Sequence, residues 1–574
     1  MKSLPPIHKA LEEADLRGEL IPYVLSLESL AGRLECGPVL CELHNAGKIS
    51  LVSDDNLAAI EALGHNDFWS VVHSLDQAIP ELDCSYQDVL RFVQTLVDKA
   101  GSDGAAGMPN QSLVKWCKVN PEKAKQIVSE AKYLDKICLS HCVFAIQGLG
   151  DAELAFELLG HSDKVVVAAG LRSLGRLEMG SGTIAKRVID ECCEAIATGK
   201  DPYLRSSAIE TAFKTWEKIG PLEPYTQKEF LKAITSEKEG DELVQLSASL
   251  FYYQKGLVDE SINQILEALV GEISNPQATL HWLDHAIHSK DERWSLTKII
   301  DVLAAQIPKL DNPIESRQLY NFCQWIWEDP DNASQLFSSW IVSGQFSLCK
   351  FLVDMVGEGG KKNTLVEISK PDLPNDSDNQ IFMARKCVGF LWLHEVTAAS
   401  ILLSIVKNGK KAARAAAEDL LFDPLLLSYG GDLRSFLEGQ AQNPSKRISD
   451  CVRRLLKSHD AYIAGLKKVE HLVEFFPTIE QRRAAVVKDR ERNKDIQKQA
   501  HERSIFSQLV THQTLLYGKK SFSIIHGGDG KKIPSVTSLS EFSYSTEFPR
   551  LSVVDPVGFN QALTIFRIER KVSQ

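Results

Sequence analysis

The sequence predicts a mainly α-helical protein built from stacked helix pairs, and three observations support this prediction. Through residue 517, apolar residues recur at spacings of three and four, as they do from Val89 to Val97. Short Gly, Asn, Asp and Pro segments separate these runs, and strand-type alternation is scarce before the C-terminus. One capped helix pattern also recurs in the centre of the chain. An all-parallel α/β fold is therefore disfavoured.

The recurring pattern is a helix that starts after an Asp and carries small residues at its sixth and eighth places. It begins at Asp135, Asp163 and Asp201, so the copies are spaced by 28 and 38 residues. Asp caps a helix by accepting a hydrogen bond from a free amide, and the Pro after Asp201 suits a first helical turn. The small residues would let a neighbouring helix approach closely; they are Ser140, Cys142, Ala168, Gly170, Ser206 and Ala208.

These Asp-led helices and the amphipathic segments Asp151–Gly160 and Gly182–Thr198 resemble HEAT-like repeats over about residues 113–310. Asp291–Ile300 is a more divergent candidate copy. The resemblance implies an α-solenoid, which is a curved stack of helix pairs with an extended surface for protein or nucleic acid. It implies no chemistry.

Two linkers rich in turn-forming residues, Ala100–Ser112 and Val356–Gln380, divide the chain. We expect four parts: an N-terminal helical region (1–99), a HEAT-like repeat region (113–355), a basic helical domain (381–517) and a small β-rich C-terminal element (518–574).

The β-rich element is predicted from a change of pattern after Tyr517. Ser521–Ile525 and Lys531–Val536 flank the glycine-rich segment Gly527–Gly530, which is typical of a hairpin because glycine tolerates positive φ. Ala562–Ile568 is a candidate for one more strand.

Composition favours a globular protein in a reducing compartment. Of 574 residues, 44% are hydrophobic and 25% are charged, which excludes wholesale disorder. The 12 cysteines form no CxxC pair and many lie in apolar helical segments, and the N-terminus lacks a secretory leader, so we expect a cytoplasmic protein.

The most apolar window, Cys387–Val406, contains His394 and Glu395. A charged Glu costs about 3 kcal/mol at the centre of a bilayer, so we predict a core helix and no membrane insertion.

The net charge of −11 is unevenly distributed. Residues 401–520 hold 22 Lys and Arg against 14 Asp and Glu, whereas the first 400 residues carry a net charge of −20. Such an asymmetry favours a nucleic-acid or acidic-protein surface in the last third of the chain. The candidate nucleic-acid-binding residues are Lys446, Arg447, Arg453, Arg454, Arg482, Arg483, Arg490, Lys494 and Lys498.

Three of these residues, Arg490, Lys494 and Lys498, are four apart and share one face of the predicted helix 478–503. All nine Trp precede residue 400, so contact with a duplex backbone is favoured over base stacking. The alternative is a solvated helix in which acidic neighbours such as Asp489 and Glu491 pair with these cations.

Other polar clusters have an ordinary structural explanation. His281, His285 and His288 share one helix face, but no HExxH pattern is present, and Cys138, His141 and Cys142 fall on a packing face. We therefore predict no metal site and no cofactor.

Glu395 is a candidate functional acid because a carboxylate within an apolar helix needs a partner or a raised pKa.

We expect a non-enzymatic helical-repeat adaptor with protein partners, whose basic module contacts double-stranded DNA. It would serve as an accessory subunit of a DNA-acting complex, for example in genome maintenance or antiviral defence. The first alternative is a purely protein–protein scaffold. The second is a hydrolase or glycosylase on a helical-repeat scaffold, with Glu395 or the His281/His285 face in its site.

Overall fold

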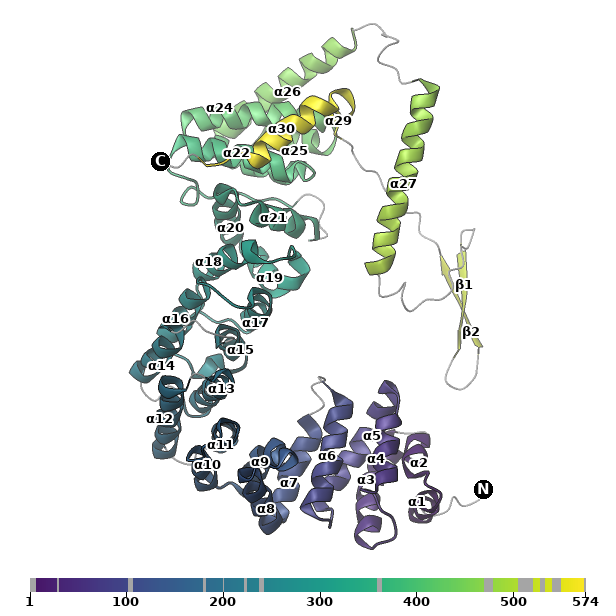
Figure 1. Ribbon diagram of the computed structural model, residues 1–574. Helices are drawn as coiled ribbons and strands as arrows, with labels where there is room; N and C mark the ends of the chain where they lie inside the picture. Colours follow the sequence, from purple (N-terminus) through teal and green to yellow (C-terminus); the bar gives the residue numbers. More distant parts are fainter. Residues whose placement is uncertain are drawn as a thin grey trace. The chain divides into compact units, whose positions relative to one another are not determined.

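The computed structural model in Figure 1 is mainly helical. It describes residues 7–27, 30–101, 107–178, 182–199, 201–220, 224–236, 242–358, 364–468, 478–503, 520–526, 532–538 and 549–571. The chain forms two compact units. Unit 1 comprises residues 1–332 and 350–358, and unit 2 comprises residues 333–349 and 359–574.

Unit 1 is a stack of helix pairs in two rows. In the first row each helix packs on the next odd-numbered one: α1 (Ile7–Leu16), α3 (Leu30–Asn45), α5 (His65–Ala78), α7 (Gly107–Val119), α9 (Lys136–Leu149), α11 (Lys164–Arg176), α13 (Pro202–Ile219), α15 (Glu242–Tyr253), α17 (Pro276–His288) and α19 (Tyr320–Glu328).

The second row holds the even-numbered helices α2 (Leu20–Ser26), α4 (Asp54–Ala62), α6 (Tyr86–Ala100), α8 (Pro121–Lys132), α10 (Ala152–Leu159), α12 (Gly182–Thr198), α14 (Pro224–Ser236), α16 (Asp259–Leu269) and α18 (Leu296–Gln306). Short 3₁₀ turns follow or precede several helices: η1 (Ile79–Glu81), η3 (Gln254–Gly256), η4 (Ile307–Lys309) and η5 (Ser316–Leu319). Two-row stacking of helix pairs is the architecture of an α-solenoid. It begins with α1 and α3, well before the region of the predicted repeats.

The three Asp-led helix starts are confirmed. Asp135 accepts a hydrogen bond from the Cys138 amide at 2.8 Å, and Asp163 accepts one from the Val165 amide at 2.8 Å. Asp201 caps α13 through the amides of residues 203 and 204 at 3.1 and 3.0 Å, with a proline in the first turn. Each cap satisfies amides that the helix itself leaves unpaired.

The predicted close approach of helices is confirmed at Gly170. A Cβ atom added there would lie 2.9 Å from the Ala155 carbonyl oxygen and 2.9 Å from a Leu159 methyl group, so α10 can press directly on α11 only because residue 170 has no side chain.

A buried ion pair joins α13 to α15. Arg205 Nε donates to Glu242 Oε1 at 2.7 Å, and only 4% and 6% of the two side chains are exposed. Arg205 also donates from Nη1 to the Ile196 carbonyl at 2.8 Å, near the end of α12. One guanidinium thus links three helices of the stack, α12, α13 and α15.

Unit 2 contains α20 (Pro330–Ser343), α22 (Ser377–Leu391), α23 (Glu395–Asn408), α24 (Lys411–Leu420), a π-helical turn η6 (Leu421–Leu426), α25 (Asp432–Gln440), α26 (Lys446–Leu466), α27 (Ile479–Arg503), α29 (Leu551–Val554) and α30 (Pro556–Ile568). Helix α21 (Phe346–Glu358) is divided between the two units, and the first three residues of α20 also belong to unit 1. Helix α23 is the centre of the core of unit 2, because every residue from Glu395 to Val406 is buried.

The prediction of one core helix over Cys387–Val406 is wrong, although the segment is largely buried. Helix α22 ends at Leu391, the His394 amide donates to the Leu391 carbonyl at 2.8 Å, and α23 begins at Glu395. A new helix start gives the Glu395 carboxylate the positive end of a helix dipole, which the middle of a continuous helix would not provide.

The predicted strand Ala562–Ile568 is also wrong, because these residues belong to helix α30. Its start is capped by Asp555 with Pro556 in the first turn, and Phe559 and Leu563 are buried one turn apart. Helix α30 packs on α22. Buried Lys386 donates to the Arg567 carbonyl at 2.6 Å.

Two short strands precede this helix in the chain. Strands β1 (Lys520–His526) and β2 (Lys532–Ser538) pair antiparallel, with Ile525 opposite Ile533. The glycine-rich segment Gly527–Gly530 lies outside the described residues. A wider β-rich element over 518–574 is not confirmed.

Candidate nucleic-acid interface

The predicted basic residues of α26 lie beside a second basic segment. Arg447 donates from Nη1 to the Lys407 carbonyl at 2.9 Å, which places the start of α26 against the end of α23. Lys410 and Lys411 follow directly at the start of α24, and both are exposed, as are Lys446 and Arg447. The fold thus gathers five cations that are up to 40 residues apart in sequence. We call them the basic corner: Lys407, Lys410, Lys411, Lys446 and Arg447.

The next two predicted residues of α26 are paired with acids. Arg454 binds Glu418 of α24 with two hydrogen bonds, at 2.8 and 2.7 Å, and this contact raises the pKa of the guanidinium. Arg453 donates to Asp450 at 3.5 Å and to the Ala441 carbonyl at 3.1 Å. Both side chains remain more than half exposed, but part of their charge is neutralised locally.

Helix α27 carries the other five predicted residues and is stabilised at its start by a capping box. The Gln481 amide donates to the Thr478 hydroxyl at 3.2 Å, and the Thr478 amide donates back to Gln481 Oε1 at 2.8 Å. Every side chain of α27 whose surroundings the structure describes is exposed. Three apolar side chains, Val486, Val487 and Ile496, are at least half exposed among the polar ones, so the described part of α27 presents no buried apolar stripe.

Four exposed cations of α27 fall on one side of the helix at 100° per residue, and we call them the basic stripe: Arg483, Arg490, Lys494 and Lys498. The side chain of Arg482 lies outside the described residues. Glu480 falls at the same angle as Lys498, Glu491 lies just beyond it, and exposed Val487 falls between the cations, so this side of α27 is mainly but not purely basic.

Glu395 is buried, with 9% of the residue exposed, in the first turn of α23. Its neighbour His394 is part-buried, and burial lowers the pKa of that imidazole. The positive end of a helix dipole stabilises a carboxylate at this position, which gives Glu395 a structural role. A catalytic role for it remains a prediction.

The histidine and cysteine clusters have the packing roles expected from the sequence. Cys138, His141 and Cys142 are buried, and His141 Nδ1 lies 3.0 Å from the Ile137 carbonyl oxygen. Burial raises the pKa of the Cys138 thiol to about 12, so this thiol is protonated at neutral pH. Among the described residues, no three His, Cys, Asp or Glu side chains are grouped as a metal site requires.

His281 and His285 belong to an aromatic surface on α15 and α17. Their rings are 4.5 Å apart, and His285 also packs 5.6 Å from Phe251. Trp282 lies 5.5 Å from Tyr252, which is 52% exposed. Sequence reasoning selected the two histidines but missed the aromatic partners, because these come from a helix about 30 residues earlier.

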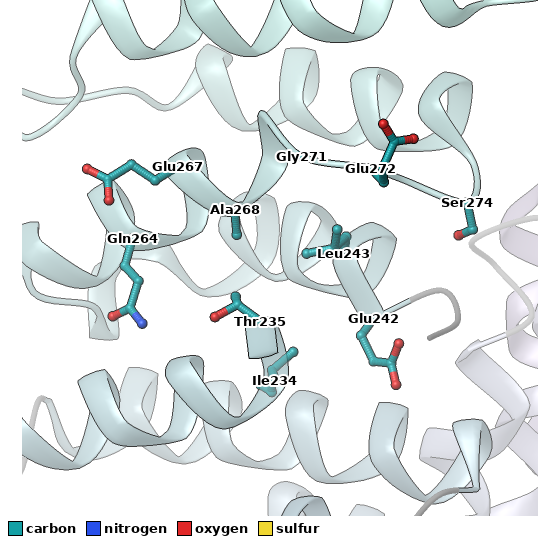
Figure 2. Close-up of a pocket in the computed structure, with 10 residues that line it drawn as sticks. All are labelled: Ile234, Thr235, Glu242, Leu243, Gln264, Glu267, Ala268, Gly271, Glu272 and Ser274. Atoms are coloured by element: carbon teal, nitrogen blue, oxygen red, sulfur yellow. The ribbon is translucent and has the colours of Figure 1, made fainter. Parts of the chain in front are cut away.

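Figure 2 shows a pocket in unit 1 whose lining includes three glutamates, and its volume is about 310 Å³. Each of these carboxylates has a cationic partner. Arg205 binds Glu242, Lys298 lies 2.5 Å from Glu267, and Lys309 lies 3.7 Å from Glu272. Because its charges are already balanced, this pocket offers no excess negative charge to a cationic ligand.

Over the described residues, every helix is too short or too polar to cross a lipid bilayer. A scan of the sequence against models of known protein families gives no match. A search of curated proteins gives no significant match either.

Proposed function

We propose that this protein is a non-enzymatic, HEAT-like adaptor whose C-terminal unit contacts the phosphate backbone of double-stranded DNA. The observation that carries the proposal is the basic stripe of α27, since exposed cations on one side of a helix are what backbone contact needs. The two-row helix stack of unit 1 supports a role in binding the protein partners of a larger complex.

The dimensions of the basic stripe suit a duplex. Arg483 and Lys498 are 15 residues apart, which corresponds to about 22 Å along a helix. Successive base pairs rise about 3.4 Å, so the stripe spans the axial length of roughly six base pairs. Contact of this kind requires no particular base sequence, because phosphates carry no sequence information.

The free thiols of the chain support a reducing compartment. All 12 cysteines are free, and nine of them are buried. A cytoplasmic setting is therefore part of the proposal.

The test is binding of a fluorescent duplex of about 30 base pairs to the full chain at low salt. We expect binding by the wild type and its loss in the triple variant Arg490→Glu/Lys494→Glu/Lys498→Glu. The matched control reverses three exposed lysines of unit 1, Lys118, Lys136 and Lys255, so that both variants have the same net charge. Equal loss in both variants, or no binding by the wild type, would overturn the proposal.

A purely protein–protein scaffold is the second candidate, and the pairing of Arg454 with Glu418 favours it. That bidentate contact, together with the Arg453–Asp450 pair, interleaves acids with the bases of α26. If the protein is such a scaffold, it should not bind a duplex, and its basic corner should bind an acidic protein surface.

A further inference from the structure

A groove of about 630 Å³ lies in unit 2 beside α26, away from the basic stripe in sequence. One wall is the turn before α25, and the opposite wall is the C-terminal half of α26, joined by Arg550 from the segment before α29. The polar groups that matter for its chemistry are Ser428, Arg434, His459, Asp460, Lys467 and Arg550.

Arg434 lines this groove and is oriented by three hydrogen bonds. Its Nη1 lies 2.8 Å from His459 Nδ1 and 2.8 Å from Asp460 Oδ1, and its Nε donates to Glu438 at 2.9 Å. An arginine can only donate, so His459 Nδ1 accepts, and the proton of the neutral imidazole lies on Nε2. Burial and the adjacent Arg434 lower the pKa of His459, which keeps the imidazole neutral at physiological pH.

The groove has an excess of positive charge. Its lining contains three cations, Arg434, Lys467 and Arg550, against the single carboxylate of Asp460. Glu438 partly balances Arg434 from outside the lining. Arg550 is fixed by its own backbone, because its amide donates to the Ser428 carbonyl at 2.9 Å.

Ser428 supplies the observation that points to a ligand. The residue is 2% exposed and lines the groove, yet its hydroxyl oxygen has no hydrogen-bond partner among the described residues. Buried hydroxyl groups are normally paired, and a hydroxyl without a partner is costly unless another molecule supplies one.

We propose that this groove binds the phosphate group of a nucleotide-sized ligand. A phosphate would accept charge-assisted hydrogen bonds from Lys467 and Arg550. It would also accept from the Ser428 hydroxyl once that side chain rotates toward the groove, because the hydroxyl oxygen is fully buried in the present conformation. Leu427 and Ile463 would cover the less polar part of the ligand, and the volume lies in the range of small-molecule sites. The inference goes beyond the proposed function, since no residue of the basic stripe takes part.

The shared chemistry is a phosphate group, whose source is either a free phosphate compound or the end of a duplex. Calorimetric titration of the full chain with inorganic phosphate tests the first source. Anisotropy with duplexes that differ only in a 5′-phosphate or a 5′-hydroxyl tests the second. The variants are Ser428→Ala and Arg550→Gln, and the control is Lys457→Gln, an exposed residue of α26 outside the groove.

We expect phosphate, free or at the 5′ end, to bind wild type and control alike and about tenfold more weakly to both groove variants. The melting temperature of Ser428→Ala should equal or exceed that of the wild type, since the lost hydroxyl has no partner. The proposal is overturned if inorganic phosphate does not bind at about 10 mM and the 5′-phosphate and 5′-hydroxyl duplexes bind equally, or if the groove variants bind like the control. Binding of the 5′-hydroxyl duplex reports on the basic stripe, so the two proposals can fail separately.

Discussion

Removing one partner of the Arg205–Glu242 pair should lower the free energy needed for local opening in the middle of the helix stack. Both side chains are almost fully buried, and the Nε–Oε1 distance is 2.7 Å. The variant Glu242→Leu leaves the Arg205 guanidinium buried without its carboxylate, and breaking such a pair costs about 3–5 kcal/mol. Replacing both partners, as in Arg205→Met/Glu242→Leu, removes the uncompensated charge and should restore most of that stability.

Hydrogen exchange of the amides of α13 and α15, followed by mass spectrometry, measures the free energy of local opening. A decrease of about 3–5 kcal/mol in the free energy of opening corresponds to amide exchange that is about 150- to 5,000-fold faster in Glu242→Leu than in the wild type. The control is Lys132→Met, which breaks the exposed Lys132–Glu157 pair at 2.8 Å. It should change exchange by less than about fivefold, because exposed pairs contribute about 0–1 kcal/mol. A similarly small change in Glu242→Leu would refute the reasoning.

Three further predictions follow from buried groups. Burial lowers the pKa of His141 and His394, so as the pH falls these imidazoles become protonated in the unfolded chain before they do in the folded one. The melting temperature should therefore be lower at pH 5.5 than at pH 7.5, and this difference should be smaller in the double variant His141→Asn/His394→Asn. Gly170→Val should destabilise unit 1 by about 1–3 kcal/mol in urea unfolding, because its Cβ meets the α10 backbone; an unchanged midpoint would contradict the close approach. Burial lowers the pKa of Lys386 and raises the pKa of buried thiols such as Cys138, and these thiols make the folded chain less stable as the pH rises toward 10.5. The Lys386 contribution has the opposite sign, so the wild type should lose less stability over this pH range than Lys386→Met does, as thermal scans would show.

Local sequence signals predicted much of unit 1. The caps at Asp135, Asp163 and Asp201 depend on residues two or three positions away, and the close approach at Gly170 depends on the lack of a side chain. Such features are visible in a single segment. The extent of the stack was not predicted, because the first helices carry no Asp-led pattern and pair through ordinary apolar faces.

Contacts between segments that are far apart in the sequence determine the features that the sequence patterns did not predict. Ala562–Ile568 has the β-branched and aromatic residues of a strand, but packing on α22, with Phe566 against Gly389 about 180 residues earlier, selects a helix. The same holds for the candidate site. Arg454 meets Glu418 only through the fold, and Arg550 reaches the groove of Ser428 from more than 100 residues away.

The most direct test of duplex contact by the basic stripe is the salt dependence of binding by the full chain. Each neutralised phosphate contributes about −0.9 to the slope of log K against log salt. Four contacts from Arg483, Arg490, Lys494 and Lys498 therefore predict a slope of roughly −3.6, reduced to about −0.9 in the triple reversal variant if any binding remains. A slope near zero, or the same slope in both proteins, would contradict duplex contact through α27.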